Sequence, residues 1–234
     1  MSTTAALAPV SLRRRAVLSP SEIEAANTRL AGATPSEIIA WASARFGARL
    51  AMTASFADTT LIDLATAVDP DIEVIFLDTG FHFPETLATV RRAMERYALN
   101  LTVLRPDPGD GRHVDDVWAA GTEACCHARK VAPLEAYLPG HADAWLSGLR
   151  RADSPDRAET PIVALDRRGL VKVNPMAEMT DAEYDAYVAD HDVLVNTLTF
   201  DGYASIGCWP CTEPAADRSG RWAGLDKTEC GLHL

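Results

Sequence analysis

The sequence lacks a long apolar run: no stretch approaches the roughly 20 consecutive apolar residues that a bilayer-spanning helix needs. We therefore expect no membrane span. It also lacks an excess of positive charge, because 22 Lys and Arg stand against 33 Asp and Glu, for a net charge of −11. A protein that wraps duplex nucleic acid needs a basic face, so the composition argues against that class. A small anion held by a local basic cluster stays compatible with it.

Export signals and repeats are also missing. Residues 11–17, SLRRRAV, contain three arginines, but polar residues follow where a signal peptide would have an apolar core. We read residues 1–18 as a disordered N-terminal tail. The sequence shows no internal repeat and no low-complexity tract, and its 234 residues suit one large domain. We expect a single domain over residues 19–234.

Cysteine is scarce, with five residues in the whole chain. An odd number of cysteines without an export signal indicates reduced thiols in a cytoplasm, where they bind metal or do chemistry more often than they form disulfides. We therefore expect a cytoplasmic protein. The five are Cys125, Cys126, Cys208, Cys211 and Cys230.

Apolar periodicity and capping residues predict an α/β fold. Strand-like and helix-like segments alternate, which makes a parallel sheet with helices on its faces. Ligands bind such sheets at the carboxyl ends of the strands, here the loops 53–60 and 77–86. The predicted helices are 19–32, 34–47, 57–68, 84–99 and 180–192, the last capped by Thr180. The predicted strands are 49–55, 71–80, 101–106, 142–151, 160–168 and 169–175, the last two as a hairpin.

Four of the cysteines form two pairs. Cys125 and Cys126 are adjacent, and adjacent cysteines rarely bond to each other because the eight-membered ring strains the peptide. Cys208 and Cys211 form a CxxC pair, which alone fits a redox disulfide, half a metal site or chance. Together the four sulfurs match a tetrathiolate site. Zinc sites draw on two CxxC-like pairs, so the tandem pair favours an iron–sulfur cluster with separate iron corners; four buried structural thiols are the alternative.

Cys230 stands near the end of the sequence, where chains are usually mobile. Lys227 and His233 flank it, and either cation could lower the thiol pKa. Gly231 gives the backbone freedom beside the sulfur. We therefore expect a mobile C-terminal segment, about residues 215–234, that carries a nucleophile; a surface thiol without a role is the alternative.

Basic residues are grouped at 129–130, 150–157 and 218–221, near the cysteines. Surface arginines are usually just solvated. Three groups around thiols in an acidic protein nevertheless indicate a pocket for a multiply charged anion, because guanidinium forks suit phosphate and sulfate oxygens. His82 follows a predicted strand, but a lone loop histidine is more often merely exposed, so we leave it outside the site.

Seven motifs together resemble a known family. They are FLDTGFHFPET, CCHARKVAPL, SGLRR, LVKVNP, IGCWPCT, GRW and KTECGLH. In unbroken order from about residue 35 to the end, they resemble the assimilatory adenylyl-sulfate (APS) reductases of the phosphoadenylyl-sulfate (PAPS) reductase family. The resemblance implies an adenine nucleotide α-hydrolase-like (PP-loop) fold, which is a parallel sheet with helices on both faces. It also implies a loop-rich, cluster-binding C-terminal part.

The resemblance further implies a chemistry. A 4Fe–4S cluster would bind Cys125, Cys126, Cys208 and Cys211. Cys230 would take the sulfonate from adenosine 5′-phosphosulfate as S-sulfocysteine and release AMP, after which thioredoxin or a similar dithiol protein would free sulfite. The substrate contacts carried over from the family are Ser55, Phe56, Lys130, Arg157, Arg218, Arg221 and His233.

Other functions stay open at this stage. The loop 53–60, TASFADTT, lacks the Ser-Gly-Gly of ATP-cleaving relatives, which argues against ATP hydrolysis. The alternatives are a PAPS reductase with the same chemistry, a zinc-stabilised nucleotide-binding module and a PP-loop thiolation enzyme. Relatives with the cluster cysteines tend toward APS. The sequence leaves the oligomeric state open, a homo-oligomer included.

Overall fold

The computed structural model describes residues 17–106, 119–225, 227–229 and 231–232. A six-stranded sheet in the order β3-β2-β1-β4-β6-β5 forms its centre. All neighbouring strands are parallel except β5 and β6, which are antiparallel. The strands are β1 (Leu50–Ala54), β2 (Glu73–Leu77), β3 (Asn100–Leu104), β4 (Ala144–Leu146), β5 (Val163–Leu165) and β6 (Val171–Val173).

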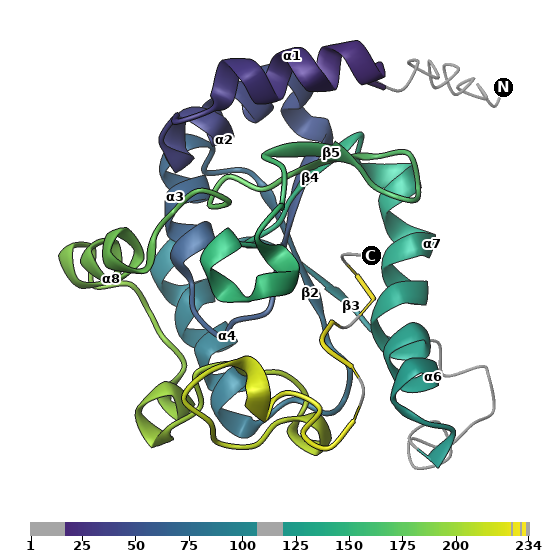
Figure 1. Ribbon diagram of the computed structural model, residues 1–234, viewed down its shortest axis with the longest axis vertical. Coiled ribbons are helices and arrows are strands. Elements are labelled where there is room, and N and C mark those ends of the chain that lie inside the picture. The colour runs from purple at the N-terminus through teal and green to yellow at the C-terminus, as the bar shows by residue number, and fades with distance from the viewer. Residues whose placement is uncertain (1–16, 107–118, 226, 230, 233–234) are drawn as a thin grey trace, which may run out of the picture.

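Helices cover both faces of this sheet, with α2, α3 and α4 on one side and α7 on the other (Figure 1). Three helices begin with the same device, in which a Ser or Thr and the Glu three residues later bond reciprocally to each other's backbone N–H groups. The caps are Ser19, Thr34 and Thr180, of which Thr180 was predicted from the sequence. The helices are α1 (Pro20–Leu30), α2 (Pro35–Phe46), α3 (Thr60–Val68), α4 (Pro84–Tyr97), α6 (Thr122–Cys126), α7 (Ala132–His141) and α8 (Asp181–Asp190).

Two of the apolar clusters among the described residues hold the three layers together. The larger packs α1 to α4 against one face of the sheet, and the smaller packs α7 against the other. Leu134 and Leu138 of α7 and Trp145 of β4 are fully buried in the smaller core. Burying side chains of this size contributes roughly 1.5–3 kcal/mol each. The smaller core therefore fixes α7, and with it the cysteine-bearing α6 that precedes it.

The order of the strands creates a gap at the carboxyl edge of the sheet. The chain winds from β1 outward to β2 and β3, and then returns to place β4 on the opposite side of β1. The connections on either side of β1 leave in opposite directions at this point. Parallel sheets bind ligands at such a switch point.

The predicted elements are confirmed in type and order, with shorter bounds. The hairpin predicted over 160–175 is present, with Val163 paired to Val173. The helix predicted from residue 57 begins at Thr60, because the backbone of residues 57–59 pairs with residues 194–196 instead. Residues 1–16 of the predicted tail lie outside the described residues, whereas Leu18 is buried in the larger core. None of the described helices is both long and apolar enough to span a membrane.

Candidate functional site

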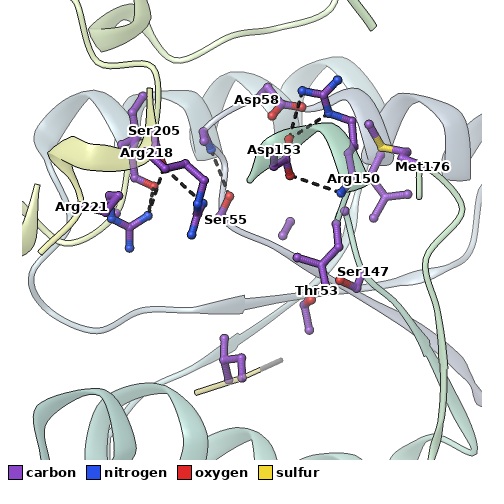
Figure 2. Close-up of a pocket in the computed structure, with 18 of the residues that line it drawn as sticks. Thr53, Ser55, Asp58, Ser147, Arg150, Asp153, Met176, Ser205, Arg218 and Arg221 are labelled. Carbon is purple, nitrogen blue, oxygen red and sulfur yellow. Dashed lines mark hydrogen bonds and ion pairs between the residues drawn. The ribbon is translucent and has the colours of Figure 1, made fainter. Parts of the chain in front are cut away.

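A cavity of about 530 Å³ opens at the switch point of the sheet. Its floor is formed where β1, β2 and β4 end, at residues that include Thr53, Leu77 and Ser147. The volume lies within the range of pockets that enclose small molecules. Ser55 stands between the two ends of the cavity, which differ in charge (Figure 2). The cavity therefore offers a long molecule two different environments.

One end of the cavity is basic. Arg157, Arg218, Arg221 and Lys130 all line it, and Figure 2 shows Arg218 and Arg221 beside Ser205. The Arg221 guanidinium lies so close to Gly207 that an added Cβ there would be 2.3 Å from its Nη2. A contact under 3 Å is a clash, so glycine at this position leaves the space that the guanidinium fills.

Glu229 lies among these arginines. Arg157 donates from Nε and Nη2 to the two carboxylate oxygens of Glu229, at 2.6 and 3.0 Å, and from Nη1 to Asp153 at 2.7 Å. Arg218 Nη2 lies 3.3 Å from Glu229 Oε1. Burial lowers the pKa of Arg157, but the hydrogen bonds and charges of Glu229 and Asp153 outweigh burial and raise it. The pKa of Arg218 is lowered, first by burial and then by the neighbouring Arg157.

The other end of the cavity combines apolar side chains with an arginine that is paired to carboxylates. Arg150 is held by Asp153 and Asp181, each at 3.0 Å, and its guanidinium lies 4.4 Å from the centroid of the Tyr184 ring. Met176 lies beside it (Figure 2). Since its charge is already balanced, Arg150 has little left for a ligand anion. An anionic group at one end and an apolar, planar group at the other would suit this cavity.

A second, smaller cavity is lined by Cys125, Cys126, Cys208 and Cys211. The first pair ends α6, directly before a π-helical turn, His127–Val131, that carries Arg129 and Lys130. Of the second pair, Cys208 precedes a short helical turn, Trp209–Cys211, and Cys211 ends it. Elements far apart in sequence thus bring the four thiols together, as the sequence pattern predicted.

Burial affects the protonation of two of these thiols. It raises the pKa of Cys125, and burial followed by the neighbouring Cys208 raises the pKa of Cys211 to about 11. The four cysteines form no disulfide. In the absence of metal the Cys211 thiol therefore stays protonated at neutral pH, and a metal that binds it must displace the proton.

The cysteine cavity fits a sulfur-ligated cluster by its donors. Among the described residues, no group of three or more His, Cys, Asp or Glu is arranged around a single metal ion. Arg129 Nε, Arg221 Nε and Trp222 Nε1 are buried without a hydrogen-bond partner, and all three residues line this cavity. Buried N–H donors normally have acceptors. Four thiols with surrounding N–H donors suit a cluster that takes one thiolate per iron and offers sulfur as an acceptor.

The two cavities share a wall. Lys130, Arg221 and Trp222 line both of them. The positive charge of Lys130 also lowers the pKa of Cys125 and of Cys211, opposing the effect of burial. Groups in the two cavities therefore influence each other electrostatically through this wall.

The structure brings most of the predicted contacts to the larger cavity. Ser55, Lys130, Arg157, Arg218 and Arg221 line it. Phe56 does not: it is fully buried in the core and packs edge-on against Phe76, with ring centroids 5.2 Å apart. Its positive φ turns the loop so that the side chain leaves the cavity. Cys230 and His233 lie outside the described residues.

The residues of the cavity wall that were not predicted from the sequence include His82 and Glu229. His82 donates from Nε2 to Leu77 O at 2.9 Å when that nitrogen carries the proton, and burial lowers its pKa. The position of His82 directly after a strand was the available signal. Glu229 had no such signal, because nothing in the sequence shows that the segment folds back onto Arg157.

Comparison with known proteins defines the family. The family model described as phosphoadenosine phosphosulfate reductase domain matches residues 49–214. A Streptomyces coelicolor protein named adenosine 5′-phosphosulfate reductase is 44% identical over 222 residues, covering 90% of this chain and 92% of its own. A Mycolicibacterium smegmatis protein of the same name is 42% identical over 217 residues, covering 88% and 90%. The chain belongs to the phosphoadenosine phosphosulfate reductase family.

Solved structures agree in fold. The phosphoadenylyl-sulfate reductase of Candida auris, solved with phosphate, has a TM-score of 0.74 at 28% identity and covers 84% of this chain and 98% of its own. The FMN adenylyltransferase of Candida glabrata has a TM-score of 0.57 at 14% identity, covering 84% of this chain and 68% of its own, which shows the fold alone. The PP-loop-like α/β fold expected from the sequence is thereby confirmed.

Proposed function

We propose that this protein is an assimilatory APS reductase that converts adenosine 5′-phosphosulfate to sulfite and AMP. The observation that carries the proposal is the shared wall of Lys130, Arg221 and Trp222 between an anion-binding cavity and a four-thiol cavity. A redox disulfide pair would need only one pair of thiols, and a simple nucleotide-binding module would not need a thiol cavity beside its anion site. Relatives named adenosine 5′-phosphosulfate reductase at 41–44% identity support the choice of substrate.

In this proposal the Cys230 thiolate attacks the sulfur of the sulfonate. A new S–S bond forms, the bond between that sulfur and the phosphate oxygen breaks, and AMP leaves with the oxygen and the electron pair. A thiolate of thioredoxin or a similar dithiol protein then attacks Cys230 Sγ and releases sulfite. Its second thiol resolves the mixed disulfide, so the partner is oxidised and Cys230 is restored.

The basic end of the cavity supplies the electrostatic conditions for this attack. A thiolate that approaches a phosphosulfate meets negative charge on both groups. Arg157, Arg218, Arg221 and Lys130 neutralise that charge, which stabilises both the bound substrate and the transition state. The other end, where Met176 and Leu149 provide apolar contacts, would take the adenine ring.

We further propose that Cys125, Cys126, Cys208 and Cys211 hold a 4Fe–4S cluster. When bound, the cluster supplies a fixed charge and a rigid four-point attachment between α6 and the Trp209–Cys211 turn. Electrons for the reduction come from thiols, so the cluster needs no change of redox state. The protein itself holds Lys130 and Arg221 in the wall between the two cavities.

The proposal also assigns a cytoplasmic location, because the four described cysteines are free thiols and such thiols persist in reducing compartments.

Mass spectrometry of the intact protein tests the reaction. Protein purified anaerobically with its cluster is mixed with APS alone, without a dithiol partner. We expect one added sulfonate per chain, no adduct in Cys230→Ser, and release of the adduct as sulfite when thioredoxin is added. Absence of the adduct from protein that carries its cluster would contradict the proposal. Parallel rates with APS and PAPS then establish the preferred nucleotide.

A further inference from the structure

The Glu229 carboxylate occupies the place where the substrate's anionic group is expected. We propose that Glu229 is a positioning residue: it fills the anion site of the substrate-free protein, and the phosphosulfate displaces it. Binding of substrate would thereby release the segment that precedes Cys230. This inference rests on the proposed function and assigns its site a built-in competitor.

The contacts of Glu229 support this role. Both of its carboxylate oxygens accept from Arg157, and one of them also lies 3.3 Å from Arg218. The side chains of Glu229 and Arg157 are each only 12% exposed. All three nitrogens of Arg157 are engaged, two by Glu229 and one by Asp153. A second anion can therefore reach the Arg157 fork only where Glu229 leaves it.

The charges around Arg157 lead to the same conclusion. Lys172 interacts electrostatically with Arg157 and with Glu229, so three cations, Arg157, Arg218 and Lys172, share the two carboxylates of Glu229 and Asp153. A phosphosulfate added beside both carboxylates would meet like charge at close range. A phosphosulfate that replaces Glu229 instead meets only Asp153 there, and its two negative charges are matched by the cations that Glu229 leaves. Exchange of one anion for another is thus the favourable way to bind.

Other contacts keep the segment near the cavity when Glu229 is displaced. Lys227 pairs with Glu123 of α6, and its side chain is 5% exposed. Leu232 packs against the smaller core beneath α7. Glu229 lies between these two attachments. Its displacement would therefore change the segment locally, and Cys230 is the next residue in the sequence.

Competition of this kind predicts a measurable gain in affinity. If the anion site is open in only a small fraction of molecules, the apparent dissociation constant exceeds the intrinsic one by the inverse of that fraction. A minor state at 10% or less then corresponds to about a tenfold or greater weakening. Removal of the Glu229 charge should lower the apparent dissociation constant by this factor for ligands that carry a phosphate. It should leave the dissociation constant unchanged for ligands without a phosphate.

Calorimetry on the cluster-loaded protein tests the inference with two probes, AMP and adenosine. In Glu229→Gln we expect the dissociation constant of AMP to fall about tenfold or more, and that of adenosine to stay as in the wild type. Glu159→Gln is the matched control, because it removes the same charge from an exposed position outside the cavity wall. We expect it to change neither constant. Glu229→Asp, with a carboxylate that reaches less far, should give an intermediate value for AMP.

Three results would overturn the inference: unchanged AMP binding in Glu229→Gln, weaker AMP binding, or an equal gain for adenosine. The last would mean that the segment blocks the cavity by its bulk. Absorbance of the cluster near ~400 nm verifies that each variant is intact, and Glu229→Asp decides the matter should Glu229→Gln lose its cluster. A sulfonate adduct in wild-type protein without an AMP gain in the variants would defeat this inference alone. Absence of the adduct would defeat the proposed function.

Discussion

Lys172 provides the sharpest test of how burial and neighbouring charges act on the side chains near Arg157. It lies on β6 with 7% of its surface exposed, and its ammonium lies 5.4 Å from the centroid of the Trp145 ring. Burial, and next the nearby Arg157, lower the pKa of Lys172 from 10.5 to about 8, against the opposing effect of Asp166 and Glu229. The folded protein therefore holds this proton less tightly than the unfolded chain does.

The sign and size of the effect on stability follow from linkage. Between pH 8 and 10.5 the unfolded chain keeps the proton that the folded protein has lost, so the free energy of unfolding rises with pH in this window. The gain is lost as pH falls to 8. Since tenfold in proton affinity is worth about 1.4 kcal/mol, the contribution of Lys172 is on the order of 3 kcal/mol.

Substitution of Lys172 isolates this contribution. Lys172→Met keeps most of the side-chain volume. In this variant we expect residue 172 to contribute no rise in the free energy of unfolding between pH 8 and 10. The wild type should therefore gain on the order of 2–3 kcal/mol relative to the variant over that range. Lys172→Arg is the control, because a guanidinium keeps its charge over this pH range. Residue 172 should then contribute as little to the pH dependence of the free energy of unfolding as it does in Lys172→Met. Anaerobic urea unfolding at several pH values measures the difference, and parallel curves for wild type and Lys172→Met would refute the reasoning.

Two further substitutions test the two cavities. Arg157→Gln removes charge-assisted hydrogen bonds worth about 1.5–3 kcal/mol, so KM for APS should rise roughly tenfold to 150-fold; an unchanged KM in steady-state assays would remove Arg157 from the anion site. Trp222→Phe keeps a smaller aromatic ring but loses the pyrrole ring, whose buried N–H lacks a protein partner beside the cysteines. The cluster should then be lost faster to a chelator, followed by its visible absorbance, and equal loss rates in wild type and variant would contradict a role for that N–H as a donor to the cluster.

Much of the fold was predictable because its signals are local. Helix caps such as Ser19, Thr34 and Thr180 act within one turn, so the sequence pattern alone locates the starts of those helices. The hairpin at 160–175 and the alternation of strands and helices follow from short-range apolar periodicity. The start of α3 was predicted three residues early, because residues 57–59 pair with residues 194–196, which are distant in the sequence.

The candidate site was predictable in its residue types and less so in its arrangement. The four paired cysteines and the grouped arginines can be recognised from the sequence without the structure. Their convergence in two cavities with a common wall is a tertiary fact. The contact between Glu229 and Arg157 joins residues 72 positions apart, and no periodicity or spacing encodes it.

The sequence by itself determined the α/β class, the sulfur-rich and cationic character of the site and the family to which the chain belongs, because composition, caps and motifs act locally or are specific as written. Only the tertiary structure decided that Phe56 faces the core, that Lys172 is buried near Arg157 and that the Glu229 carboxylate pairs with Arg157. These facts depend on which surfaces meet when the helices pack on the sheet. The burial of a side chain and its charged partners are determined only by that packing.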